Sequence, residues 1–299
     1  MMRDLGFIGV GAMATPMVRR FIERGWTAHL VDPVRERTAE FVDHPQVVIH
    51  EDVAALVDAT AYILLSLPTP HALSEVSARL ASVNTRSPVI VINTSTTGMA
   101  ATREAAERLA AAGLAFVDAP VSGGVVGARE GSLTVLVSGA DEPVQACRPV
   151  FEVIGRQVLR IGSEVGQAQV MKVANNVLSL GALAATAEAT ALTRRAGIPM
   201  DIAISALDAG SGRNSATSVK FPRHILSGKF DFGFPAEGAL KDVSLFTALA
   251  AELGVATPLA QAVVDCWRFA VERGYGAEDC TRIVTMYERM AGLYQEGEQ

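Results

Sequence analysis

A lone lysine stands close to two asparagines in an otherwise small and apolar segment, GQAQVMKVANNV, at residues 166–177. On a helix, residues three and four positions apart share a face, so Lys172, Asn175 and Asn176 point the same way. Burial lowers the pKa of a lysine ammonium, which allows such a group to exchange a proton near neutral pH. An asparagine one turn on can orient the reacting oxygen. The spacing predicts general acid/base chemistry; the alternative is a lysine that reaches the surface beside locally hydrogen-bonded asparagines.

The stretch FIGVGAMA carries a G-x-G-x-x-A pattern straight after a predicted strand. Gly9 permits a tight turn, Gly11 lets the backbone approach a pyrophosphate, and Ala14 is small enough for helix–strand packing. The N-terminus of the following helix then receives the phosphates. The pattern predicts dinucleotide contacts from Gly9, Gly11, Ala12 and Met13.

Asp32 ends the second predicted strand, where a carboxylate can bind the adenosine ribose hydroxyls. Its charge would repel the extra phosphate of NADP, so it favours NAD. Arg35 and Arg37 lie just past the strand and could pair with that phosphate, which keeps NADP as the less favoured alternative. The competing interpretation is a glycine-rich turn followed by an ordinary surface aspartate.

Three further segments end predicted strands: LSLPTP (65–70), INTST (92–96) and DAPVSGG (118–124). The carboxyl ends of parallel strands form the edge at which open sheets bind ligands. In the third segment, the Ser122 hydroxyl and the backbone N–H groups beside Gly123 and Gly124 can hold a carboxylate.

The elements that position these residues fall into two sets. Residues 1–163 alternate short apolar runs with helical patterns, which predicts an α/β doubly wound, parallel sheet. After Gly162 the strand signals stop, and residues 165–195 form one long helical pattern, with Gly197 just beyond its end. Three or four further helices extend to residue 292. We therefore predict a Rossmann-type NAD-binding domain at 1–163 and an all-helical substrate and dimerisation domain at 164–299.

Composition excludes several classes of partner. The net charge of −6, without any basic run, argues against nucleic acid and anionic membranes. No apolar run is expected to be long enough to cross a bilayer. The three cysteines and five histidines fit no disulfide or metal-ligand framework, so we predict a cytoplasmic protein without a metal. The long helix is apolar around most of its circumference, which predicts a homodimer or homotetramer.

The motifs resemble those of the β-hydroxyacid dehydrogenases, a family that includes 3-hydroxyisobutyrate dehydrogenase and tartronate semialdehyde reductase. GVGAMA, SLPTP, INTST, DAPVSGG, GQAQVMKVANN and LKDVSL occur in the family's order, from about residue 5 to residue 290. The resemblance implies hydride transfer between NAD and a small anionic β-hydroxy acid, with Lys172 as general acid/base. It implies substrate contacts from Ser122, Gly123, Gly124 and Asn176, with Asn175 beside them, and cofactor contacts from Leu67, Pro68, Thr96 and Lys241.

The sequence also departs from the family. Ala14 and Ala168 stand where the family usually has glycine, and Asn93 replaces a frequent aspartate, which leaves one polar contact open. Among other residues, His71 is the alternative acid/base, and Arg213 lies either at a substrate carboxylate or in a solvated loop.

Three other functions remain as alternatives. One is a non-catalytic dinucleotide-binding module, and another is an imine reductase-like enzyme; both typically lack the lysine. The third is a decarboxylating enzyme like 6-phosphogluconate dehydrogenase, which has a histidine in place of Asn175 and a much longer helical domain.

Overall fold

The computed structural model describes residues 3–84 and 88–293. It divides into two compact units, Met1–Lys172 and Val173–Gln299. The division falls inside the longest helix, α8 (Gln167–Arg195). We refer to the two parts as the sheet unit and the helical unit.

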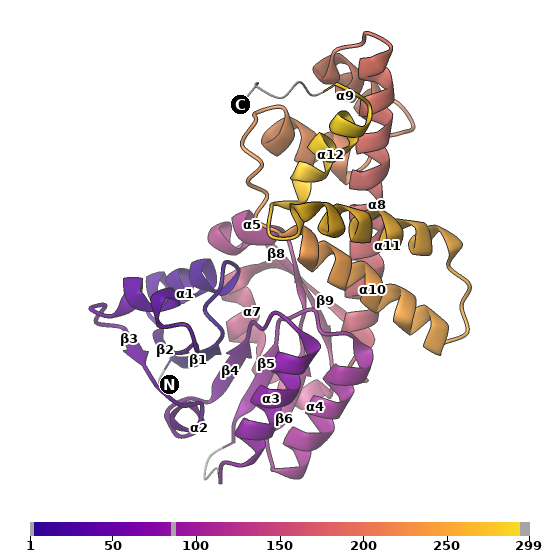
Figure 1. The fold of residues 1–299 in the computed structure, drawn as a ribbon. Helices are drawn as coiled ribbons and strands as arrows, with labels where there is room; N and C mark the ends of the chain where they lie inside the picture. The colour runs from indigo at the N-terminus through magenta and orange to yellow at the C-terminus, as the bar shows by residue number, and fades with distance from the viewer. Residues whose placement is uncertain (1–2, 85–87, 294–299) are drawn as a thin grey trace. The chain divides into compact units, whose positions relative to one another are not determined.

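A nine-stranded sheet forms the centre of the sheet unit (Figure 1). Its order is β3-β2-β1-β4-β5-β6-β8-β7, with β9 paired to β8. From β3 to β6 all pairs are parallel, as the alternating pattern predicts. The strands are β1 (Asp4–Ile8), β2 (Thr27–Val31), β3 (Val47–Ile49), β4 (Tyr62–Leu65), β5 (Ile90–Asn93), β6 (Ala115–Asp118), β7 (Val121–Ser122), β8 (Leu133–Ser138) and β9 (Gly155–Gly162).

The end of the sheet formed by β6, β8 and β7 differs from the predicted parallel arrangement, because β8 pairs antiparallel with β6 and β7. The apolar pattern of a strand does not record the direction of its neighbour, so the sequence does not reveal this reversal. Strand β3 was not predicted either. It is only three residues long and partly exposed, so its hydrophobic signal is weak.

Helices cover both faces of the sheet, and successive residues of a strand enter different cores. Phe7 packs in one core with Phe21 and Phe151, whereas Ile8 packs in the other with Leu73 and Leu109. The helices of this unit are α1 (Ala14–Glu23), α2 (Ala54–Ala59), α3 (Pro70–Ala81), α4 (Met99–Ala111), α5 (Gly124–Glu130), α6 (Asp141–Ala146) and α7 (Arg148–Ile154), with short 3₁₀ turns η1 (Arg35–Arg37) and η2 (Ala39–Phe41).

The helical unit contains no strand among its described residues up to 293, as predicted, and one isolated bridge joins Pro235 to Asp279. Its core is built around the fully buried Trp267 and Phe221. Its elements after α8 are α9 (Met200–Ala209), π-helix η3 (Ala216–Ile225), α10 (Ala236–Glu252), α11 (Pro258–Ala270), π-helix η4 (Val271–Tyr275), 3₁₀ turn η5 (Cys280–Arg282) and α12 (Ile283–Met290).

Helix α8 is, by length and composition alone, apolar enough to cross a bilayer, whereas the sequence predicted no such run. Val177, Leu180 and Leu183 nevertheless pack in the core of the helical unit, and the core helix of a globular protein has the same composition.

Candidate active site

The glycine turn after β1 has the conformation that its sequence predicts. Gly9 has a φ of +89°, and a Cβ there would lie 2.3 Å from the backbone oxygen of Ser66, so only glycine fits. A Cβ on Gly11 would meet nothing within 4 Å, so the backbone at this position borders open space. Met13 occupies the N-cap of α1, with Ala12 before it. The turn thus leaves room for phosphates at the start of α1.

The carboxylate of Asp32 fastens this turn to the end of β2. It accepts hydrogen bonds from the backbone N–H groups of Val10 (2.7 Å) and Val34 (2.8 Å), and its side chain has no exposed surface. The guanidinium of Arg37 lies 3.5 Å from it, whereas Arg35 pairs with an exposed glutamate instead. The sequence did not reveal that Asp32 supports the glycine turn.

The loops after β4 and β5 hold each other in place. Leu67, which precedes Pro68, donates its backbone N–H to the Ser95 hydroxyl at 2.8 Å. Thr96 follows Ser95 in the second loop. The predicted cofactor contacts Leu67 and Thr96 therefore come from two loops that are directly hydrogen-bonded.

Asn93, the residue that departs from the family pattern, has a defined role. It is fully buried, accepts the backbone N–H of Ser95 at 3.2 Å and donates to the Thr97 hydroxyl at 3.1 Å. An ionised aspartate could not donate the second bond. The Asn93 amide therefore holds the loop after β5 through both its oxygen and its nitrogen.

The segment DAPVSGG turns from β6 through β7 into α5. Ser122 ends β7, and Gly123 and Gly124 have φ values of +134° and +64°. L side chains rarely adopt these conformations, so the segment requires both glycines. The Ser122 hydroxyl and this turn stand together at the start of α5.

Asp118, at the head of the same segment, ties the beginning of α8 to the sheet. It is fully buried and accepts hydrogen bonds from Gln169 Nε2 (2.7 Å), Ser138 Oγ (3.2 Å) and the Gly166 backbone N–H (3.2 Å). Burial raises the pKa of Asp118 to about 6, although the bonds from Gln169 and Ser138 act in the opposite direction.

Gln169 extends this network to the loop after β5. Its Oε1 accepts the backbone N–H groups of Thr97 (2.9 Å) and Gly98 (3.1 Å), and its Nε2 also donates to the Ser95 carbonyl. Lys172 follows three residues later and is only 8% exposed. The start of α8 is therefore fixed at the ligand edge of the sheet. Sequence reasoning named the segment GQAQ but missed this role.

Within the helical unit, Asn176 is held by an acidic residue that the sequence did not single out. Asn176 Nδ2 donates to Asp242 Oδ2 at 2.5 Å, and Asp242 is 2% exposed. Lys241 Nζ lies 3.1 Å from Asp242 Oδ1. The two groups form an ion pair, but the angles between them are not those of a hydrogen bond. Asn175 is exposed and donates to Asn176 Oδ1 at 3.2 Å. Asp242 thereby sets the orientation of the Asn176 amide.

Two other candidates lie in solvent. The His71 side chain is 82% exposed and 3.5 Å from Glu75, so it is not held in a closed site. Arg213 is 70% exposed, with Asp208 at 3.8 Å, which is the geometry of a solvated loop.

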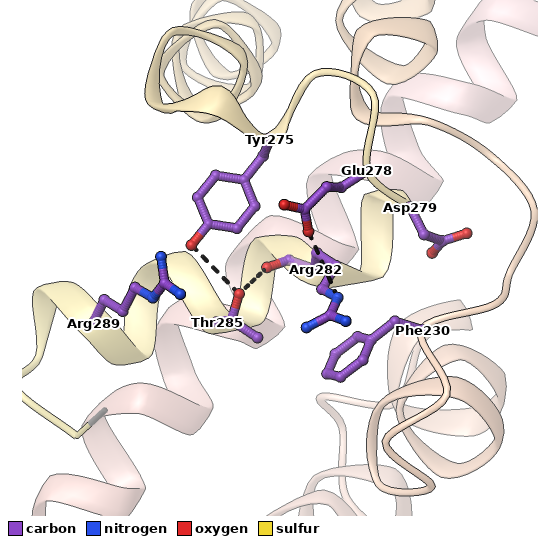
Figure 2. A pocket seen from close by; sticks show the side chains of 7 residues that line it. All are labelled: Phe230, Tyr275, Glu278, Asp279, Arg282, Thr285 and Arg289. Carbon is purple, nitrogen blue, oxygen red and sulfur yellow. Dashed lines mark hydrogen bonds and ion pairs between the residues drawn. The ribbon is translucent and has the colours of Figure 1, made fainter. Parts of the chain in front are cut away.

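A cavity of about 430 Å³ in the helical unit contains none of these candidates (Figure 2). Arg282 lies 3.6 Å from Glu278 and stacks over the Phe230 ring at 4.3 Å. Side chains of both charges face this space, which is lined by Phe230, Tyr275, Glu278, Asp279, Arg282, Thr285 and Arg289.

Comparisons with known proteins match both units. Residues 4–162 match the family model of the NAD binding domain of 6-phosphogluconate dehydrogenase. Residues 166–287 match the model for NAD-binding of NADP-dependent 3-hydroxyisobutyrate dehydrogenase. Together the two models span nearly all of the chain.

Relatives of known activity align over most of their length. The chain is 28% identical to 2-(hydroxymethyl)glutarate dehydrogenase of Eubacterium barkeri, over 99% of this chain and 98% of that protein. It is 30% identical to human mitochondrial 3-hydroxyisobutyrate dehydrogenase, over 93% of this chain and 85% of that protein. The structure of Mycobacterium tuberculosis 3-hydroxyisobutyrate dehydrogenase with L-serine aligns with a TM-score of 0.84 at 25% identity, over 96% of this chain and 99% of that one.

Proposed function

Because the chain belongs to the β-hydroxyacid dehydrogenase family, we propose that Lys172 is the acid/base with which it oxidises a small β-hydroxy acid. The chain is an NAD-binding oxidoreductase that transfers hydride to or from small hydroxy acids. The observation that carries the assignment to Lys172 is its burial three residues after Gln169, on a helix start fixed to the sheet edge.

The residues of the sheet unit fit a dinucleotide. The open backbone at Gly11 and the start of α1 would bind the pyrophosphate. Asp32 would bind the adenosine ribose, as the glycine pattern implies, but its side chain has no exposed surface in this structure, so that binding requires neighbouring side chains to move. Leu67, Pro68 and Thr96 would line the cofactor site, as the family pattern implies, and Lys241 of the helical unit would lie near the nicotinamide. The nicotinamide, when bound, supplies the hydride acceptor.

We also propose that NAD is preferred over NADP. The buried Asp32 carboxylate already attracts Arg37, so this arginine is less available for the additional phosphate. Catalytic efficiency with each cofactor tests the preference, and a higher efficiency with NADP would contradict it.

The chain's own residues can then perform the oxidation. Lys172 takes the proton of the substrate hydroxyl while Asn176 orients its oxygen, and Ser122 with the Gly123 and Gly124 turn holds the substrate carboxylate. In the reverse direction Lys172 returns the proton. Asp242, through its hydrogen bond, keeps the Asn176 amide in one orientation.

The alternatives differ in measurable products. Purified protein should reduce NAD with at least one of four hydroxy acids that relatives are named for: 3-hydroxyisobutyrate, L-threonate, L-serine and 2-(hydroxymethyl)glutarate. We expect NADH and an oxo acid in equal amounts when the oxo acid is trapped with a carbonyl reagent as it forms, because a free β-oxo acid loses CO₂ without an enzyme. CO₂ in equal amount to NADH despite the trap would indicate the decarboxylating alternative, and no reduction with any acid would favour a binding module.

We further propose a homodimer or homotetramer assembled through residues 164–299, with residues 1–163 as the NAD-binding domain. Met171, Leu178 and Leu192 are exposed at intervals of seven and fourteen residues, which places them on one stripe of α8. Burying this stripe between subunits would remove it from water. A monomeric mass by light scattering at micromolar concentration would contradict this assembly. The three free cysteines agree with the proposed cytoplasmic location.

A further inference from the structure

A second buried lysine of the helical unit has no part in the reaction described above. Lys220 lies on the π-helix η3 and is 3% exposed. Its ammonium donates to the hydroxyls of Ser179 (2.9 Å) and Ser215 (3.1 Å) and lies 5.4 Å from the centre of the Phe232 ring. Among the described residues, no carboxylate forms an ion pair with it.

The two hydroxyls bound to the Lys220 ammonium belong to residues that are less buried than the lysine itself. An oxygen that accepts a bond from the ammonium must direct its own O–H elsewhere. The two oxygens lie 3.4 Å apart, so at most one hydroxyl donates to the other and at least one O–H remains for another acceptor. Ser179 is half-buried and Ser215 is exposed. The cluster therefore offers positive charge and a hydrogen-bond donor to an anion.

The cluster lies next to the proposed reaction site along α8. Ser179 follows Lys172 by seven residues and Asn176 by three, so these side chains share one face of the helix. Three residues rise about 4.5 Å along a helix, and seven rise about 10 Å. An acceptor at Ser179 is therefore about one turn beyond the amide that would orient the substrate oxygen.

We propose that Lys220, Ser179 and Ser215 bind a second anionic group of the substrate, so that hydroxy diacids are preferred over hydroxy monoacids. The proposal rests on the proposed function, in which Lys172 and Asn176 bind the reacting hydroxyl. A rise of about 4.5 Å matches the reach of an extended chain with two or three carbons between a carbinol and a distal carboxylate. The first carboxylate remains with Ser122 and the glycine turn, so a monoacid leaves the cluster without a ligand.

Calorimetric titration of the NAD-loaded protein with glutarate and with butyrate tests this without turnover. We expect wild type to bind glutarate at least tenfold more tightly than butyrate. Lys220→Met and the double variant Ser179→Ala/Ser215→Ala should lose this difference and keep their affinity for butyrate. Lys229→Met, which removes an exposed lysine nine residues along the chain, is the matched control and should keep the preference.

Equal affinities in wild type, or a preserved preference in both the lysine and the double serine variants, would overturn the proposal. If Lys220→Met does not fold by circular dichroism, the serine variant decides, because its substitutions lie nearer the surface. If only the proposed function fails, the protein binds glutarate more tightly than butyrate but oxidises no hydroxy acid. Oxidation of monoacids without any diacid preference refutes the second site alone.

Discussion

The sheet unit and the helical unit position their candidate residues by different means. In the sheet unit, Gly9, Gly123 and Gly124 hold backbone conformations that place loops at strand ends. In the helical unit, Asn176 and Lys220 are oriented by side chains from other helices. The glycine conformations of the sheet unit are determined by short segments of sequence. The side-chain orientations of the helical unit depend on contacts between residues far apart in the chain.

Replacing Lys172 should have the largest effect, because it removes the group that transfers the proton. Lys172→Ala should lower the turnover number by roughly 10²–10⁴-fold. Lys172→Arg should be nearly as inactive, since a guanidinium stays protonated and is a poor base. Affinity for NAD, measured by fluorescence titration, should change little because the phosphate contacts come from the turn at Gly11. Near-normal turnover with only weaker substrate binding would make Lys172 a positioning charge.

Asp118 makes the stability of the sheet unit depend on pH. Its pKa in the folded protein is about 6, raised from 3.8, so the protonated form is favoured by folding. The resulting stabilisation is complete below pH 3.8 and is lost as the pH rises through 6; the difference corresponds to about 3 kcal/mol. Relative to Asp118→Asn, wild type should therefore lose about this much free energy of unfolding between pH 4 and pH 7 in urea titrations. A gap between the two proteins that stays constant with pH would contradict the role of burial.

Substituting two glycines of one turn should have different effects: at Gly9 on the free energy of unfolding, and at Gly11 on NAD affinity. Gly9→Ala places a Cβ against the Ser66 carbonyl at a positive φ and should destabilise the protein by about 1–3 kcal/mol. Gly11→Ala meets no protein atom, so the free energy of unfolding should stay equal or rise slightly while NAD affinity falls. Urea unfolding and NAD titration of both variants check this. The expectation fails if Gly11→Ala binds NAD as wild type does.

Replacing Asp242 should have the smallest effect on turnover, because Asp242 acts only through its hydrogen bond with Asn176. Asp242→Ala leaves the Asn176 amide without its acceptor, and turnover should fall roughly tenfold, equivalent to about 1.4 kcal/mol. Asn175→Ala, at an exposed neighbour, is the control and should cost less. Steady-state kinetics and thermal melts of both variants are the measurements. A larger loss in Asn175→Ala would mean that Asn175, rather than Asp242, orients Asn176.

Much of the sheet unit was predictable because its signals are local. The glycine pattern places Gly9 and Gly11 in the turn after β1, and apolar runs locate most strands. The antiparallel pairing of β8 was not predictable, since strand direction depends on a neighbour. The bond from Gln169 to Asp118 was missed for a similar reason: 51 residues separate the two.

In the helical unit, sequence predicted the helices and the helical face that carries Asn176, but not what holds it. Asp242 is 66 residues from Asn176, and Lys220 is 41 residues from Ser179. Helix packing decides which of many polar residues meet across such distances, and helical periodicity shows only which face is turned inward. The π-helical winding of η3, which carries Lys220, gave no recognisable pattern either.

Hydride transfer from the substrate carbinol carbon is the central claim, and isotope transfer tests it most directly. Wild-type protein is supplied with NAD and an active hydroxy acid that carries deuterium on that carbon, and the reduced cofactor is examined by mass spectrometry. We expect each reduced nicotinamide to contain one deuterium, with the same labelling but much slower formation in Lys172→Ala. Reduced cofactor without deuterium, or label released into water, would contradict direct transfer.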